Sequence, residues 1–256
     1  MCAMKNSILL ATPAYGGLLH SKYVKSLVST CNDLAFRGIV HGLYIIPNES
    51  LISRARNRCA AFALRQGFER LMFIDADLGW KPADMDAILN SDKLVVGGTY
   101  PLKQFSPRRL AYNPHREARF PDGIGMRSLE ELQYLKDHYA DNATGEVCVR
   151  HVPTGFMMIH CSVLTRLQDF VPDYLHEDSG DGALEQQYDY FPVRLRGKTY
   201  ESEDWAFCSL VREHLDCGVW LNTRVVLSHT GIYTYTAEGE NDGERALDGR
   251  LPAVNG

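Results

Sequence analysis

Two carboxylates one residue apart, Asp75 and Asp77, have the clearest chemical potential in this sequence. They follow an apolar run at residues 71–74, whose composition is typical of a buried strand. In open α/β sheets, ligands bind at the carboxyl ends of strands, so we expect both side chains to face a ligand. Two such acids repel each other unless a divalent cation or a shared proton offsets their charge. Because such a cation keeps open positions for phosphate oxygens, the pair predicts a metal site for a nucleotide or another diphosphate.

Strand and helix patterns alternate through the first hundred residues. Strands are expected at residues 7–12, 39–46, 71–74 and 93–98. Helices are expected to end at Gly38, to begin near Leu51 and to span residues 81–90. This alternation predicts an α/β fold: a Rossmann-like domain with a mostly parallel central sheet and flanking helices.

The regular patterns become sparser after Tyr100, where four prolines interrupt a basic stretch. We expect a small lobe there. Further strands are predicted at residues 146–152, 156–160 and 225–229, and helices at residues 161–170 and 201–214. The acidic, glycine-containing residues 176–189 are expected to form a mobile loop.

Composition restricts the class of protein. With 256 residues, 45% hydrophobic and 23% charged, the chain can bury the core of one large domain. Its seven cysteines are scattered without a Cys-x-x-Cys pair, which argues against a disulfide framework and a zinc cluster. No apolar run approaches the roughly 18 residues of a membrane span, so we expect a cytoplasmic protein.

Charge is unevenly distributed along the chain. The net charge of -5 argues against general coating of nucleic acid. Nevertheless, five basic residues and a single acid lie between residues 100 and 120. This segment, from Lys103 to Arg119, is interpreted either as a surface that attracts phosphate, DNA included, or as an ordinary solvated loop.

Several further motifs occur in a fixed order around the acid pair. They are Thr12-Pro13-Ala14-Tyr15, Ser53-Arg54-Ala55-Arg56-Asn57, Thr154-Gly155-Phe156, Glu203-Asp204 and Ser228-His229-Thr230-Gly231. Each motif alone is weak. Together with Asp75-Ala76-Asp77, they resemble the GT-A fold glycosyltransferases over residues 8–231.

The resemblance implies a nucleoside diphosphate sugar donor, with a UDP-sugar as the first expectation. Its base would lie against the first strand. The implied donor-binding residues are Thr12, Pro13, Ala14, Tyr15, Arg54, Asn57, Arg58, Asp75, Ala76 and Asp77. Residues 1–98 would form the nucleotide-sugar-binding half of a single domain, residues 99–235 the acceptor-binding and catalytic half, and residues 236–256 a polar tail.

The resemblance also implies a Mn²⁺ or Mg²⁺ ion on the Asp-x-Asp motif. Asp77 would be the direct ligand, Asp75 would lie nearer the ribose or act through water, and His229 would be an additional ligand. Oxygen ligands suit either ion, and an imidazole favours manganese. The metal would neutralise the charge that builds on the leaving diphosphate.

An inverting transfer further needs a base for the acceptor hydroxyl. Asp204 is the first candidate and Glu203 the second, because a carboxylate at a helix N-terminus is stabilised as the anion. In a retaining enzyme, these acids would instead orient the acceptor or stabilise an oxocarbenium-like centre.

The acceptor side is expected to include Gly98, Tyr100, Gly155 and Trp205. A glycine at a strand end permits close approach of a ligand, and aromatic faces suit sugars and bases. The acceptor class stays open among a glycan, a small metabolite, a protein and a modified nucleobase in DNA.

Each motif also has a purely structural interpretation. Arg54 and Arg58 could form ion pairs with Glu49 or Glu69, and His229 could be a core histidine. Alternative functions are a non-catalytic sugar-nucleotide-binding protein and an Asp-x-Asp phosphatase. A P-loop ATPase is disfavoured because the sequence has no Gly-x-x-x-x-Gly-Lys motif.

Overall fold

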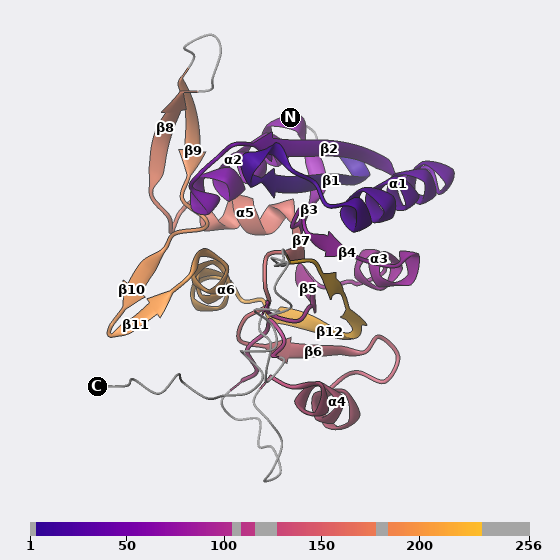
Figure 1. Ribbon diagram of the computed structural model, residues 1–256. Helices are drawn as coiled ribbons and strands as arrows, with labels where there is room; N and C mark the ends of the chain where they lie inside the picture. Colours follow the sequence, from indigo (N-terminus) through magenta and orange to yellow (C-terminus); the bar gives the residue numbers. More distant parts are fainter. Residues whose placement is uncertain (1–3, 104–108, 116–126, 178–183, 232–256) are drawn as a thin grey trace, which may run out of the picture.

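A computed structural model describes residues 4–103, 109–115, 127–177 and 184–231. At its centre is a seven-stranded sheet with the order β2-β1-β3-β7-β5-β12-β6 (Figure 1). The strands are β1 (Met4–Ala14), β2 (Val40–Pro47), β3 (Phe68–Ile74), β5 (Val95–Thr99), β6 (Glu146–Val149), β7 (Phe156–His160) and β12 (Val219–Val226). Only β7 and β6 run antiparallel to their neighbours. Five strands therefore share one direction, which confirms the predicted α/β fold with a mostly parallel sheet.

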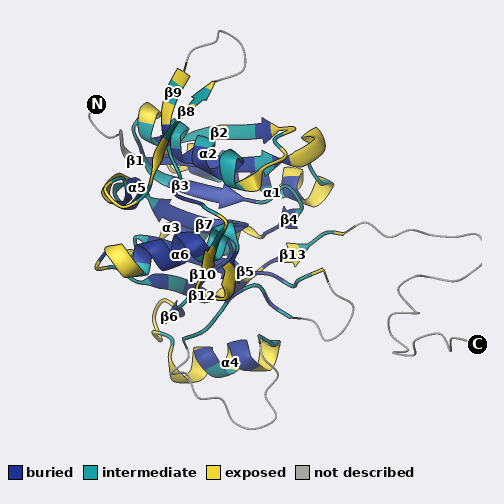
Figure 2. Ribbon diagram, turned by 90° about the vertical axis from the view of Figure 1, so that its left-hand side faces the viewer, coloured by how far each residue is buried: buried dark blue, intermediate teal, exposed yellow. Residues whose placement is uncertain are grey.

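Helices cover both faces of this sheet. They are α1 (Ser21–Phe36), α2 (Ile52–Gln66), α3 (Pro82–Leu89), α4 (Leu129–His138), α5 (Cys161–Leu167) and α6 (Glu203–His214), with a 3-10 turn η1 (Tyr15–Gly17) after β1. Helices α1 and α3 pack into one hydrophobic core, and α2, α4, α5 and α6 pack into the other. The central strands between these cores are largely buried (Figure 2). Among the described residues, no helix has the length and apolar character needed to cross a bilayer.

Strand β3 shows why the acid pair was conspicuous in the sequence. Leu71 and Phe73 pack into the core of α2, α5 and α6, whereas Met72 and Ile74 pack into the core of α1 and α3. All four side chains are fully buried. A strand covered on both faces has no polar alternation and reads as a continuous apolar run. The run stops at Asp75, where β3 ends and the chain turns.

A two-stranded ladder lies beyond this turn. It pairs β4 (Leu78–Gly79) with β13 (Ser228–His229) in antiparallel register, so that His229 stands opposite Leu78. The predicted last strand at residues 225–229 is therefore wrong in its bounds. The chain forms β12 from Val219 to Val226 and then this separate ladder. The ladder brings the end of the described chain back to the Asp75–Asp77 turn.

The prediction of a mobile loop at residues 176–189 is also wrong for the residues that the structure describes. Strands β8 (Asp173–Glu177) and β9 (Leu184–Tyr188) form an antiparallel hairpin that projects from the domain (Figure 1). Because most of its residues are exposed or only half-buried, acidic side chains are tolerated there and conceal the strand pattern. A second hairpin, β10 (Arg194–Arg196) with β11 (Thr199–Glu201), lies beside α6.

Candidate active site

The Asp75–Asp77 turn is held against the start of β7. The backbone N–H of Asp75 donates to the carbonyl of Gly155 at 2.9 Å. Two side-chain atoms approach Gly155 closely: a β-carbon there would lie 2.3 Å from the Tyr100 hydroxyl oxygen and 2.6 Å from Asp75 Oδ2. Gly155 therefore leaves the space in which Asp75 and Tyr100 meet. The structure thus brings together three residues that were predicted separately.

Asp77 lies between two basic groups. Lys103 Nζ is 2.5 Å from Asp77 Oδ2, and His229 Nε2 is 3.5 Å from Asp77 Oδ1. Burial opposes ionisation of Asp77, but hydrogen bonds with His229 and Lys103 outweigh it and lower its pKa to about 2. Asp77 is therefore an anion across the physiological range.

A backbone carbonyl fixes the orientation of the His229 ring. Its Nδ1 lies 2.7 Å from the carbonyl oxygen of Pro101, and because a carbonyl only accepts, Nδ1 is the donor. The hydrogen bond to Asp77 then needs a proton on Nε2 as well. In the neutral ring Nε2 instead has a lone pair, which could bind a cation beside Asp77. The His229 ring also meets Tyr100 edge to face at 5.0 Å. A backbone carbonyl that fixes the tautomer in this way is typical of a metal-ligating histidine.

The separation of Asp77 and His229 suits two ligands of one ion. Two ligands that lie about 2.1 Å from one ion at a right angle stand roughly 3 Å apart, and a wider angle brings them to about 3.5 Å. The observed 3.5 Å fits such a pair. No group of three or more His, Cys, Asp or Glu side chains in the described part of the chain is arranged to hold a metal. The pair would thus leave most positions to water and phosphate oxygens, as Mg²⁺ sites often do.

Arg56 links the turn to the second acid pair. It is 3% exposed, and its Nη2 lies 3.3 Å from Asp75 Oδ1 while its Nε lies 3.4 Å from Glu203 Oε1. The guanidinium also stands over the ring of Phe73 at 5.3 Å, and its Nη1 is buried without a hydrogen-bond partner. This buried cation therefore faces the acid cluster with Nη1 still able to donate a hydrogen bond.

Sequence reasoning placed Arg56 within a motif but gave it no role. Its neighbours on the buried face of α2 are Ala55, Cys59 and Ala60. An arginine three or four residues from small apolar residues on a helix lies on their face. That spacing was the signal that could have identified it.

The second acid pair opens α6, as predicted. One oxygen of Asp204 accepts from the Trp205 backbone N–H at 2.8 Å and from the Ser202 hydroxyl. Burial and the neighbouring charge of Glu203 raise the pKa of Asp204, despite these bonds and the charge of Arg56. A carboxylate whose pKa lies above its ordinary value is a better proton acceptor.

The residues expected around the donor base differ in their exposure to solvent. Thr12 is fully buried, and its hydroxyl meets that of Tyr23 at 2.5 Å inside the core. Ala14 is also buried and Pro13 half-buried, whereas Tyr15 in η1 is 77% exposed. Tyr15 is therefore the member of this motif with a face free for a ligand.

The polar residues of α2 make contacts within the protein. Arg54 forms a two-bond pair with Glu49 at 2.7 and 2.8 Å, and hydrogen bonds from Arg54, together with the charge of Arg58, lower the pKa of Glu49. The buried Asn57 donates to Asp189 Oδ1 at 2.8 Å and accepts from the backbone N–H of Phe191 at 3.1 Å. Donor binding by these residues stays a prediction.

Gly98 serves the packing of the sheet. A β-carbon at this position would lie 2.3 Å from Cγ1 of Val225, so the close approach that requires glycine comes from β12. Of the basic segment, Lys103 contacts Asp77, whereas Arg108, Arg116 and Arg119 lie outside the described residues. The polar tail at residues 236–256 also lies outside them.

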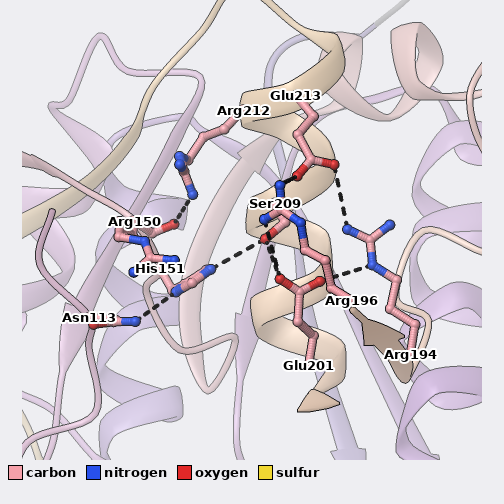
Figure 3. Close-up of polar contacts among 9 residues, drawn as sticks. All are labelled: Asn113, Arg150, His151, Arg194, Arg196, Glu201, Ser209, Arg212 and Glu213. Carbon is pink, nitrogen blue, oxygen red and sulfur yellow. Dashed lines mark hydrogen bonds and ion pairs between the residues drawn. The ribbon is translucent and has the colours of Figure 1, made fainter. Parts of the chain in front are cut away.

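Trp205 stacks on His151 at 4.8 Å, with the rings 2° from parallel. His151 belongs to a network of polar contacts around α6, which Figure 3 shows from Asn113 and His151 on one side of the helix to Arg194 and Arg196 on the other. Asn113 Nδ2 lies 3.1 Å from His151 Nδ1, His151 Nε2 lies 3.3 Å from Ser209 Oγ, and the Ser209 hydroxyl donates to Glu201 at 2.9 Å. Burial lowers the pKa of His151 to about 3, so its ring is neutral. The network fixes the ring on which Trp205 rests.

Comparison of the sequence with protein-family models and with curated proteins gave no match. Among solved structures, A197 from STIV is 14% identical over 90% of this chain and 86% of its own, with a TM-score of 0.43. GalNAc-T7 with UDP, GalNAc and Mn2+ is 9% identical over 88% of this chain and 43% of its own, with a TM-score of 0.44. A glycosyltransferase involved in the glycosylation of the major capsid of PBCV-1 is 12% identical over 64% of this chain and 68% of its own, with a TM-score of 0.29. These likenesses are distant.

Proposed function

We propose that this protein is a divalent-metal-dependent glycosyltransferase that moves a sugar from a nucleoside diphosphate sugar to an acceptor hydroxyl. UDP-sugars are the first donors to test. One observation supports this most: the Asp75–Asp77 turn meets His229 on one side and, through Arg56, the Glu203–Asp204 pair on the other. The cluster thus combines a ligand pair for a cation with a second acid pair that can accept a proton.

Asp77 and His229 would hold the Mn²⁺ or Mg²⁺ ion, with Asp75 acting near the ribose or through water. When bound, the ion offsets the charge that develops on the leaving diphosphate, an effect typically worth several kcal/mol. Asp75 is oriented for its role by Arg56 at 3.3 Å and by the Gly155 carbonyl, which accepts from its backbone. Lys103 pairs with Asp77 and would supply a further cation beside the diphosphate.

Asp204 would accept the proton of the acceptor hydroxyl in an inverting reaction. Its raised pKa suits this role, and its bonds to Ser202 and Trp205 hold the carboxylate in one orientation. Glu203 is tied to Arg56 at 3.4 Å and is less free to move. In a retaining reaction, Asp204 would instead orient the acceptor.

The acceptor would lie between Trp205 and the Tyr100–Gly155 contact, on the side of α6. Trp205 is held by its stacking on His151, so it offers a fixed apolar surface. The acceptor can be a glycan hydroxyl or a modified nucleobase in DNA. A DNA acceptor predicts salt-sensitive retention of the protein on DNA, and lack of retention at low salt would contradict it.

Hydrolysis of a panel of nucleotide sugars, with and without Mn²⁺, tests this function. Water can replace the acceptor, so the wild type should release the sugar without one. This release should occur only with the metal, which offsets the charge on the leaving diphosphate. Asp204→Asn should lower this rate roughly 10²- to 10⁴-fold while the donor still binds. Asp77→Asn should weaken Mn²⁺ binding in calorimetry.

Asp137→Asn is the matched control, because Asp137 is exposed on α4, where it accepts a hydrogen bond from Gln133. Donor binding without sugar release in the wild type would favour a non-catalytic binding protein. Release of phosphate regardless of the sugar would favour a phosphatase. Equal binding of Mn²⁺ and nucleotide by an Asp75→Ala, Asp77→Ala double variant would refute the proposed site.

A further inference from the structure

A cavity lies beside the β4–β13 ladder. Its volume is about 510 Å³, and its walls come from the first turns of α1, from residues 79–82 and from residues 226–228. Helix α1 contacts both α3 and β4, and the two helices lie next to each other (Figure 1). Successive side chains of a strand point to opposite faces, so Ser228 lines this cavity while His229 faces Asp77. The cavity and the candidate active site thus lie on opposite faces of one ladder.

Three lysines surround this cavity in a protein whose net charge is -5. They are Lys22, Lys25 and Lys81, and all three are exposed. Neither Lys22 nor Lys25 forms an ion pair with any residue that the structure describes. Asp84 is the one acid among the lining residues of the described chain, and its Oδ2 is already used by the backbone N–H of Lys81 at 2.8 Å. The cavity therefore carries an excess of positive charge.

The positions of these lysines add to that charge. Lys22 and Lys25 belong to the first two turns of α1, and Lys81 directly precedes α3. A helix N-terminus bears partial positive charge, so it favours acids and disfavours cations. The first turn of α1 has no acid and no capping side chain. Lysines placed against two helix dipoles destabilise the empty cavity, and a bound anion would relieve this repulsion.

We infer that this cavity binds a small ligand with one or two phosphate groups. Its volume lies within the roughly 300–1,000 Å³ of small-molecule pockets, whereas a nucleic-acid backbone needs an extended basic stripe. Phosphate oxygens would accept from the lysines and from the exposed Ser29 hydroxyl, and Leu227 would contact the organic part. The inference does not depend on the proposed glycosyl transfer.

Calorimetric titration with inorganic pyrophosphate in EDTA tests the site without any metal. The double variant K22Q/K25Q removes two charges from the cavity. The control K136Q/K198Q removes two charges from α4 and from the β10–β11 turn. We expect pyrophosphate to bind the K22Q/K25Q variant at least tenfold more weakly than the wild type, and the control to change less than twofold. Equal weakening in both, or no binding by the wild type at millimolar pyrophosphate, would overturn the inference.

Thermal unfolding gives an independent readout, because a ligand that binds the folded state raises Tm. Pyrophosphate should raise the Tm of the wild type and of the control, but not that of K22Q/K25Q. Without ligand, K22Q/K25Q should melt no lower than the wild type, since it removes repulsion at the α1 terminus. If that variant folds poorly, the single variant K81Q should still lose at least half of the Tm rise; an unchanged rise would contradict the site.

Two further binding measurements distinguish this site from the candidate active site and from a nucleic-acid surface. Asp77→Asn should bind pyrophosphate in EDTA as the wild type does, and loss of binding would place the anion at the candidate active site instead. A thymidine oligonucleotide without terminal phosphates should bind more weakly than pyrophosphate at equal ionic strength. Tighter binding of the oligonucleotide, lost in K22Q/K25Q, would indicate a nucleic-acid surface and overturn the small-ligand inference.

Discussion

Arg56 is the residue on which the acid cluster depends, because it contacts both Asp75, 19 positions away in the sequence, and Glu203, 147 positions away. It is almost fully buried, while the two carboxylates keep 30% and 16% of their side-chain surface exposed. Removing a buried cation leaves its partners as uncompensated charges, which costs more than the ion pair contributes. The position therefore matters for stability and for the orientation of Asp75.

Arg56→Gln should lower the free energy of unfolding by about 2–3 kcal/mol, below the roughly 3–5 kcal/mol of fully buried pairs because both acids reach solvent. Urea unfolding measures this. Arg37→Gln is the control, since Arg37 pairs with the exposed acids Asp33 and Asp86 and should cost less than about 1 kcal/mol. Similar losses in the two variants would show that Arg56 does not hold the cluster.

Asp77 should give the protein a pH-dependent part of its stability. Its folded pKa of about 2 lies below the ordinary value of 3.8, so its contribution is complete above pH 4 and is lost as pH falls toward 2. The shift corresponds to roughly 2 kcal/mol at pH 6, of which about half remains at pH 3. In EDTA, the difference in free energy of unfolding between the wild type and Asp77→Asn should therefore become smaller as pH falls from 6 to 3. A gap that is constant with pH would contradict this assignment.

At the scale of elements, two glycines at strand ends have different tasks. A β-carbon at Gly155 would meet the Tyr100 hydroxyl and Asp75 Oδ2, whereas one at Gly98 would meet the core side chain of Val225. Gly155→Ala should displace Asp75 and weaken donor and metal binding. Gly98→Ala should lower stability by about 1–3 kcal/mol through overpacking and leave those affinities unchanged in a binding assay. If Gly98→Ala changes the affinities as much as Gly155→Ala does, the two roles are not separate.

The sequence predicted the elements that have strong local patterns. Strand β1, strand β2, helix α3 and helix α6 lie within a few residues of their expected bounds, and Asp75 ends β3 as expected. The hairpin β8–β9 was missed because its exposed faces permit any polar residue. The β4–β13 ladder was missed because a two-residue strand has no periodicity to detect.

The site was predictable only in part for a related reason. Motif order identified both acid pairs and His229, which the fold places at one edge of the sheet. The contacts of Lys103 and Arg56 with these acids span long stretches of sequence and depend on packing. No local pattern encodes such contacts, so Arg54 was selected over Arg56 as a donor-binding residue.

For the whole molecule, metal removal should leave the fold intact. Asp77 already has Lys103 and His229 as basic partners within the protein, so its charge stays compensated without an ion. EDTA should therefore change Tm by less than about 2 °C while abolishing sugar release, and Mn²⁺ with UDP should raise Tm. Differential scanning fluorimetry measures both effects. A collapse of Tm in EDTA would mean that the metal is structural.

The place of β7 in the sheet has a consequence for how the chain is made. Strand β7 fills the gap between β3 and β5, although it is synthesised about sixty residues after β5. Until residue 160 leaves the ribosome, the nascent chain can form only the β2-β1-β3 part of the sheet, with an open edge on β3, and β5 lacks both of its partners, β7 and β12. Long-range pairing of this kind is slow and exposes unpaired backbone to other chains. We therefore expect truncated translation products that end between β5 and β7 to aggregate more readily than the full chain.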